Sequence, residues 1–182
     1  MVNKLVDVYD ENNKSLKLQK MLKDVHKEGL WHRVAHVWIY NSKGEILIQK
    51  RYRKKLLYPD MWDVSMQVHV SANEQPIVTA VKAMEDKLSI YTEKSKLSLI
   101  RVTKSITHYT DINNREYFYS FAFQFEGKLE NLKMKPDRTS SLEFSPILKI
   151  EKELKMTTGK YTPRGEYWNF ILNDIKTRIK KK

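Results

Sequence analysis

The residues with the clearest chemical potential lie within residues 68–90, in the segment VHVSANEQPIVTAVKAMEDKLSI. Its apolar side chains recur at helical spacing, so chemistry offered to solvent must come from the other face and from the loop before it. That loop and face carry Glu74, Lys82, Ala83, Asp86 and Lys87. Any chemistry that the segment supports must therefore come from these positions, which makes it a candidate catalytic segment.

A helix of about three turns must position these side chains. Ile77, Val81, Met84 and Leu88 recur at spacings of four, three and four residues, which predicts one apolar stripe facing a core. The preceding residues 61–68, MWDVSMQV, are typical of a strand. The chain is thus expected to run from strand to loop to helix over residues 61–90.

Composition limits the classes of protein to consider. The 182 residues predict a single domain spanning residues 1–182, with 41% hydrophobic and 31% charged residues. No apolar run approaches the roughly 18 residues of a membrane span, and no targeting pattern is visible, so we expect a cytoplasmic protein without a membrane partner. The net charge of +12 favours polyanionic partners such as nucleotides or nucleic acid. The absence of cysteine excludes disulfides, cysteine-ligated zinc and a thiol nucleophile.

Alternating apolar residues predict strands on both sides of the helix. Residues 5–10 predict a short strand, and residues 34–51 predict a hairpin. A longer hairpin is predicted over residues 97–127, and its second arm carries five aromatic residues at period two: Tyr117, Tyr119, Phe121, Phe123 and Phe125. Pro163 opens a predicted last helix over about residues 163–179. These elements predict an α+β domain with a mixed sheet flanked by helices.

The order of strand, loop, glutamate and charged helix resembles the Nudix box, and residues 5–154 resemble the Nudix (MutT-like) superfamily. The segments VHKEGLWHR, GEILIQKR and MWDVS are most similar to its isopentenyl-diphosphate-isomerase-like branch. The resemblance implies a Nudix fold, which is an α/β/α sandwich. It also implies metal-dependent hydrolysis of a nucleoside-diphosphate-linked compound, with Mg²⁺ or Mn²⁺ held by glutamates of the box.

Few carboxylates of the family's box have a counterpart in this sequence. The loop glutamate of the family matches Glu74, and its arginine falls on Lys82. Its metal-binding glutamates fall on Ala83, Asp86 and Lys87, so the formal charge at these positions changes from −3 to 0. Even at an effective dielectric of about 20, two unit charges about 4 Å apart interact by about 4 kcal/mol. The resemblance therefore predicts a degenerate box with weakened or lost hydrolysis.

Two interpretations of different classes stay open. In the first, the chain is a diphosphate hydrolase whose metal site is rebuilt from Asp86, Glu85 and a distant carboxylate such as Glu116. The candidate catalytic residues are then Glu74, Lys82, Asp86 and Glu85. The candidates to bind substrate are Arg51, Arg53 and Trp62. In the second, an inactive Nudix fold binds a nucleotide or RNA. A homodimer is compatible with both.

The isomerase-like resemblance carries an alternative set of metal ligands. Isomerases of this branch use a cysteine at the position of Gln67, so the chain is not a cysteine-dependent isomerase. His32 and His69 match metal-binding histidines of the branch. Glu116 lies near its metal-binding glutamate, and His26 is a further candidate. Imidazole and carboxylate together suit zinc or manganese, so a site at His32, His69 and Glu116 is the alternative to the box.

Overall fold

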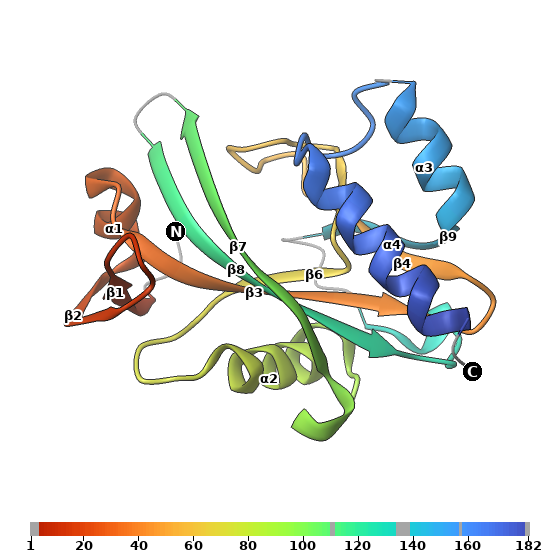
Figure 1. Cartoon of the computed structure of the whole chain (residues 1–182), viewed down its shortest axis with the longest axis horizontal. Coiled ribbons are helices and arrows are strands. Elements are labelled where there is room, and N and C mark those ends of the chain that lie inside the picture. The colour runs from red at the N-terminus through yellow and green to blue at the C-terminus, as the bar shows by residue number, and fades with distance from the viewer. Residues whose placement is uncertain (1–3, 110–111, 134–138, 157, 181–182) are drawn as a thin grey trace.

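The computed structural model describes residues 4–109, 112–133, 139–156 and 158–180. The strands in these ranges are β1 Leu5–Tyr9, β2 Ser15–Met21, β3 Trp31–Tyr40, β4 Glu45–Arg51, β5 Trp62–Asp63, β6 Met66–His69, β7 Ser98–Tyr109, β8 Ile112–Gln124 and β9 Thr139–Pro146. The helices are α1 Leu22–Glu28, α2 Pro76–Leu88, α3 Ile147–Lys155 and α4 Glu166–Lys180, with short 3-10 turns at Lys94–Lys96 and Leu129–Asn131. The strands form one mixed sheet, with α2 on one face and α3 and α4 on the other (Figure 1).

β3 is the central strand, and its partners explain the layout. On one side it pairs in parallel with β8 along its whole length, from Trp31↔Arg115 to Tyr40↔Gln124. On the other side it meets β1, β6 and β4 in succession. Alternate residues of a strand point to opposite faces, so β3 contributes to two cores. Val34 and Trp38 pack with α4, while Ala35 and Val37 pack with α2.

The predicted helix of the 68–90 segment is confirmed as α2, with Met84 and Leu88 buried as predicted, but its buried face also includes residues that the pattern placed outside it. Ala80 and Ala83 are buried against the sheet, whereas Ile77 and Val81 are only half-buried. Small side chains let the helix backbone lie close to the strands, which turns the face containing the alanines inward. Ala83 is 6% exposed and therefore does not belong to the solvent face to which the sequence pattern assigned it.

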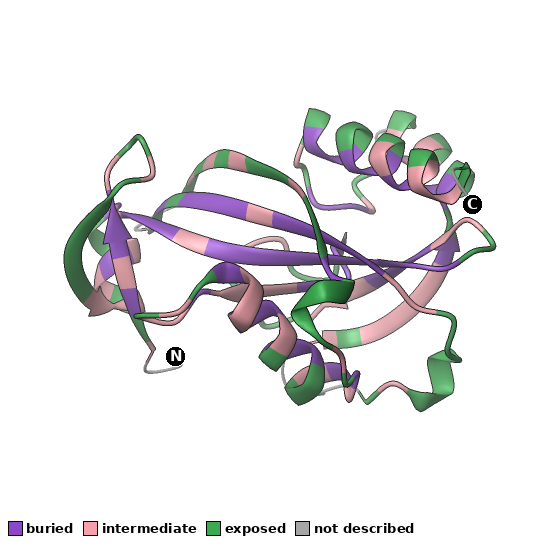
Figure 2. Ribbon diagram, turned by 60° about the horizontal axis from the view of Figure 1, so that its bottom comes forward, coloured by how far each residue is buried: buried purple, intermediate pink, exposed green. Residues whose placement is uncertain are grey.

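The two predicted hairpins and the last helix are confirmed, and the aromatic face of β8 contributes to the core beneath α2. Figure 2 shows the burial of these strands along the sheet. The predicted strand at residues 61–68 is instead split into β5 and β6. Between them the Ser65 hydroxyl donates to the carbonyl of Leu47 and accepts the backbone N–H of Ile39 at 2.9 Å. The chain there passes from pairing with β4 to pairing with β3.

No helix in the described ranges is both long and apolar enough to cross a membrane.

Candidate metal centre

The sheet register brings together ionisable side chains that are far apart in the sequence. His32 of β3 lies opposite Glu116 of β8, and Val34 of β3 lies opposite His69 of β6. Because alternate residues of β3 share a face, His32, Glu116 and His69 all project from one face of the sheet. His26 reaches the same point from α1. Near this end of the sheet the chain places three imidazoles and one carboxylate together.

The four side chains converge at the distances of a ligand cluster. One potential ligand atom from each lies within 4.8 Å of the others. The Nε2 atoms of His26 and His32 are 3.3 Å apart. Oε1 of Glu116 lies 3.6 Å from Nε2 of His32 and 3.4 Å from Nε2 of His69. Ligand atoms bonded to one transition metal at about 2.1 Å are themselves about 3–4 Å apart, so a small contraction would seat a cation.

The protonation states favour a cation as well. Burial, and then the neighbouring His69 and His32, lower the pKa of His26 to about 4. Burial likewise lowers the pKa of His69. Burial alone would raise the pKa of Glu116, but its interactions with the nearby His32 and His69 hold it well below its usual range. Neutral imidazoles and an ionised carboxylate are the forms that bind metals.

The hydrogen bonding around the centre leaves lone pairs directed into it. Nδ1 of His32 donates to the carbonyl oxygen of Leu30 at 3.1 Å, which orients its Nε2 toward the centre, 3.3 Å from Nε2 of His26. Oε1 of Glu116 and Nε2 of His69 are buried and have no hydrogen-bond partner. Oδ1 of Asn114, two residues before Glu116 on β8, is also buried without a partner. Unpaired buried polar atoms are costly, and a divalent cation would satisfy them. A site rich in imidazole suits zinc or manganese better than magnesium.

The polar face of α2 has a different character. The Lys82 ammonium donates to the Glu74 carboxylate, which also accepts the Thr79 hydroxyl at 2.6 Å. Hydrogen bonding to Lys82 lowers the pKa of Glu74. Asp86 and Glu85 are exposed, and within the described ranges they join no group of three or more potential metal ligands. The carboxylate of the loop is therefore neutralised by a lysine of the helix.

The structure separates two residue sets that the sequence analysis grouped together. Asp86 and Glu85 were predicted to share a metal with Glu116. Glu116 instead lies with His32 on the face of α4, across the sheet from α2. Because residues alternate between the two faces along β8, Glu116 points to the face opposite α2, and its placement gives no support to a site shared with Asp86 and Glu85.

The predicted substrate-binding residues lie in and beside the loop between β4 and β5. Arg51 donates to the carbonyls of Leu57 and Tyr58 and to Asp63, so it organises its own loop. Arg53 is exposed in that loop, and Trp62 packs at the edge of the core beneath α4.

Sequence reasoning missed a buried ion network beside the centre. Asp63 is fully buried and accepts from Arg51 at 2.9 Å and from Arg164 at 2.8 Å through both of its oxygens. Arg164 also donates to Oε1 of Gln67 at 3.0 Å. Burial alone would raise the pKa of Asp63, but Arg164 and Arg51 hold it well below its usual range. Arg164 lies about a hundred residues from its partner in the sequence, so no local pattern predicts the pairing.

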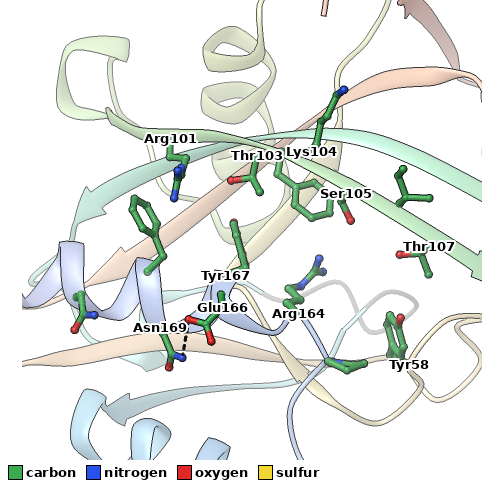
Figure 3. Close-up of a pocket in the computed structure, with 15 residues that line it drawn as sticks. Tyr58, Arg101, Thr103, Lys104, Ser105, Thr107, Arg164, Glu166, Tyr167 and Asn169 are labelled. Atoms are coloured by element: carbon green, nitrogen blue, oxygen red, sulfur yellow. Dashed lines mark hydrogen bonds between the residues drawn. The ribbon is translucent and has the colours of Figure 1, made fainter. Parts of the chain in front are cut away.

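A cleft of about 690 Å³ lies between β7 and α4 on the same face of the sheet (Figure 3). Its walls come from β7, from the segment before α4 and from α4 itself. Sequence analysis did not predict it, because the long β7–β8 hairpin and the last helix meet only in the folded chain.

Comparison with known proteins identifies the class. No protein-family model matches the chain. An uncharacterised Nudix hydrolase of Clostridium acetobutylicum is 26% identical over 145 residues, which cover 78% of this chain and 69% of that protein. Nudix hydrolase 3 of Arabidopsis thaliana is 25% identical over 175 residues, which cover 92% of this chain but 23% of that protein. An isopentenyl-diphosphate Delta-isomerase of Serratia proteamaculans is 22% identical over 138 residues, which cover 76% of this chain and 74% of that protein.

Solved structures share the architecture. DR0079 from Deinococcus radiodurans superposes with a TM-score of 0.67 at 17% identity, covering 94% of this chain and 98% of that chain. A MutT protein from Methanosarcina mazei superposes with a TM-score of 0.60 at 13% identity, covering 81% and 94% of the two chains. The fold is therefore an α+β Nudix fold. In sequence the chain is similar both to Nudix hydrolases and to isopentenyl-diphosphate isomerases.

Proposed function

We propose that this chain is a divalent-metal-dependent Nudix hydrolase whose metal lies at the centre formed by His26, His32, His69 and Glu116. The observation that carries the proposal is the convergence of four potential ligand atoms, two of them buried without a hydrogen-bond partner. The expected cation is manganese or zinc, with magnesium a weaker fit to three imidazoles.

The proposed substrate is a nucleoside-diphosphate-linked small molecule. The Nudix domain of Shewanella oneidensis NrtR was solved with ADP ribose, and it superposes with a TM-score of 0.59 at 6% identity over 82% of this chain. A cation at the centre would supply the positive charge that neutralises a diphosphate and polarises water. The chain's own contribution is three imidazoles, two placed by the sheet register and that of His26 placed by α1, together with the negative charge of Glu116.

The proposal also explains how activity could survive a degenerate Nudix box. Ala83 and Lys87 stand where the family has carboxylates, and Lys82 occupies Glu74 in an ion pair. Lys87 donates to the backbone carbonyl of Gln67 at 3.0 Å, and Gln67 lies two residues before His69. In this account α2 supports the strand that carries His69 and does not itself hold the metal.

A hydrolysis screen, in which chromatography separates the nucleoside monophosphate products, tests the proposed function. The full chain would be assayed on ADP ribose, NADH and nucleoside diphosphates with Mn²⁺, Zn²⁺ or Mg²⁺, beside E116Q and D86N. We expect E116Q to lose at least about 100-fold in turnover and D86N to lose less than about twofold. E130Q, which removes a 72% exposed carboxylate, is the surface control. Robust turnover by E116Q, together with loss in D86N, would place the reaction at the box and contradict the proposal.

A binding module without turnover is the second candidate, and the ion pair between Lys82 and Glu74 specifically favours it. The pair engages the loop carboxylate with a lysine and so withholds it from a metal ion. The net charge of +12 suits the binding of an anion such as a nucleotide or RNA, and this candidate predicts nucleotide affinity without hydrolysis. A mobility-shift assay across a salt series tests the RNA version, and absence of binding at low salt would eliminate it.

A further inference from the structure

The cleft between β7 and α4 lies on the same face of the sheet as the metal centre, although none of the four candidate ligands lines it. Ser105 of β7, which lines the cleft, lies opposite Glu116 of β8 in the antiparallel register. Thr103, also in its wall, lies opposite Phe118. Directly opposed residues of antiparallel strands share a face, with Cβ atoms about 4.5–5.5 Å apart. A molecule bound at the centre can therefore extend along β7 without leaving this face.

Arg101 lies at the far end of this wall with its charge available. Its guanidinium stacks on the Phe170 ring, 4.2 Å from the centroid. In the described part of the chain no carboxylate pairs with Arg101. Stacking fixes the plane of a guanidinium while leaving its N–H donors free, and such a fork binds phosphate oxygens in a bidentate way. Figure 3 shows Arg101 directed toward the cleft, whereas the Lys104 amine points away and lies over Trp31.

Hydroxyl groups occupy the wall between Arg101 and the centre. Thr103, Ser105 and Thr107 alternate along β7 and line the cleft. Oγ1 of Thr103 is buried and has no hydrogen-bond partner. Glu166 is the one carboxylate among the lining residues, and it accepts from the Asn169 amide at 3.4 Å. An apolar ligand would leave these hydroxyls and Arg101 without hydrogen-bond partners, whereas a hydroxylated ligand would pair with them.

We propose that the cleft binds a further phosphate group of the substrate, separate from the diphosphate at the metal centre and linked to it by a hydroxylated unit. Arg101 lies four residues before Ser105 on β7, a span of about 13 Å at about 3.3 Å per residue. Arg101 is the residue that selects for this second phosphate, and Thr103 pairs with the linking unit. The inference rests on the proposed function only in placing the diphosphate at the centre.

NADPH and NADH are matched probes, because both carry a central diphosphate and only NADPH has an additional phosphate on a ribose. Calorimetric titration of the full chain, in EDTA and again in Mn²⁺, is expected to show NADPH binding at least about tenfold more tightly. In R101Q the two affinities should become equal, with that for NADH changing less than about twofold. R115Q removes an exposed arginine on the other face of β8 and is expected to keep the preference.

The outcomes separate this inference from the proposed function. Equal affinities in the wild type, a preference retained in R101Q, or no binding of either dinucleotide would overturn the cleft assignment. A preference for NADPH that depends on Arg101, with no binding of Mn²⁺, supports the cleft and contradicts the metal-dependent function.

Discussion

The two faces of the sheet differ in what they bury. Beneath α2 the sheet is covered by apolar side chains such as Ala80, Ala83 and Met84, and the charges of this helix lie at the surface. Beneath α4 the same strands bury His32, His36, Glu116 and Ser120. Burying ionisable groups is costly, so a face that collects them carries a requirement beyond packing. Under the proposed function, α2 serves the fold and the chemistry lies across the sheet.

The strongest test of this contrast compares an ion pair from each face. D63N would leave Arg51 and Arg164 facing a neutral, fully buried amide, and we expect it to lower the free energy of unfolding by about 3–5 kcal/mol. E74Q breaks the pair with Lys82, whose side chain is 64% exposed, so solvent screening limits its effect to less than about 1 kcal/mol. Urea denaturation measures both. Similar losses in the two variants would remove the distinction between the faces.

Restoring the glutamate of the family at position 83 tests the packing role of α2. Ala83 is 6% exposed and packs on the sheet, so A83E buries a carboxylate without a partner and should cost about 3 kcal/mol or more. A83S, the smaller polar change, should cost about 1 kcal/mol. Chemical denaturation at neutral pH would measure both losses. A loss below about 1 kcal/mol for A83E would show that this face accepts a carboxylate after all.

Metal binding should stabilise the folded chain. At a free Mn²⁺ or Zn²⁺ concentration about 100 times the dissociation constant, linkage predicts about 2.7 kcal/mol of added stability. H69N should lose most of this gain, whereas H108N, on the exposed surface of β7, should keep it. Thermal unfolding with and without the cation provides the measurement. An equal gain in H69N and the wild type would place the cation elsewhere.

The pH dependence of stability reports on the buried face. Burial, and then the charge of Arg164, lower the pKa of His36 to about 3, while its Nδ1 shares a hydrogen bond of 2.7 Å with the Tyr167 hydroxyl. The unfolded chain, with a histidine pKa of about 6.5, binds this proton first as the pH falls. The contribution of neutral His36 to the free energy of unfolding is therefore fully present above about pH 6.5. Below that pH it declines by up to about 1.4 kcal/mol per pH unit.

H36N should flatten this part of the stability profile. The comparison belongs between pH 6.5 and 4.5, above the range in which the buried Asp63 takes up its proton. Unfolding titrations at fixed pH values measure the slope. An unchanged slope in H36N would show that His36 is not held neutral by this face.

Local patterns predicted the elements better than their orientation. The spacing of Met84 and Leu88 was sufficient to predict α2, and alternation predicted the β7–β8 hairpin. The strand β2 was missed because it is an exposed edge strand, where burial imposes no alternation. The buried face of α2 was misplaced because alanine carries a weak hydrophobic signal, although its small size favours close packing.

The centre could be anticipated only in part. His32, His69 and Glu116 were named as alternative ligands from the resemblance to isomerases, and the structure places their ligand atoms together with His26. What places His32, His69 and Glu116 together is the register of β3 with β8 and β6, which brings His32 beside Glu116, 84 positions further along the chain. The cleft and the arginines around Asp63 likewise depend on how the last helix crosses the sheet, and no short segment encodes that crossing.

The most direct test is an anomalous difference map from crystals of the full chain soaked in Mn²⁺. The account predicts a peak bounded by the Nε2 atoms of His26, His32 and His69 and by Oε1 of Glu116, on the face of α4. A peak beside Asp86 and Glu85 on α2, with none among the three histidines, would contradict it.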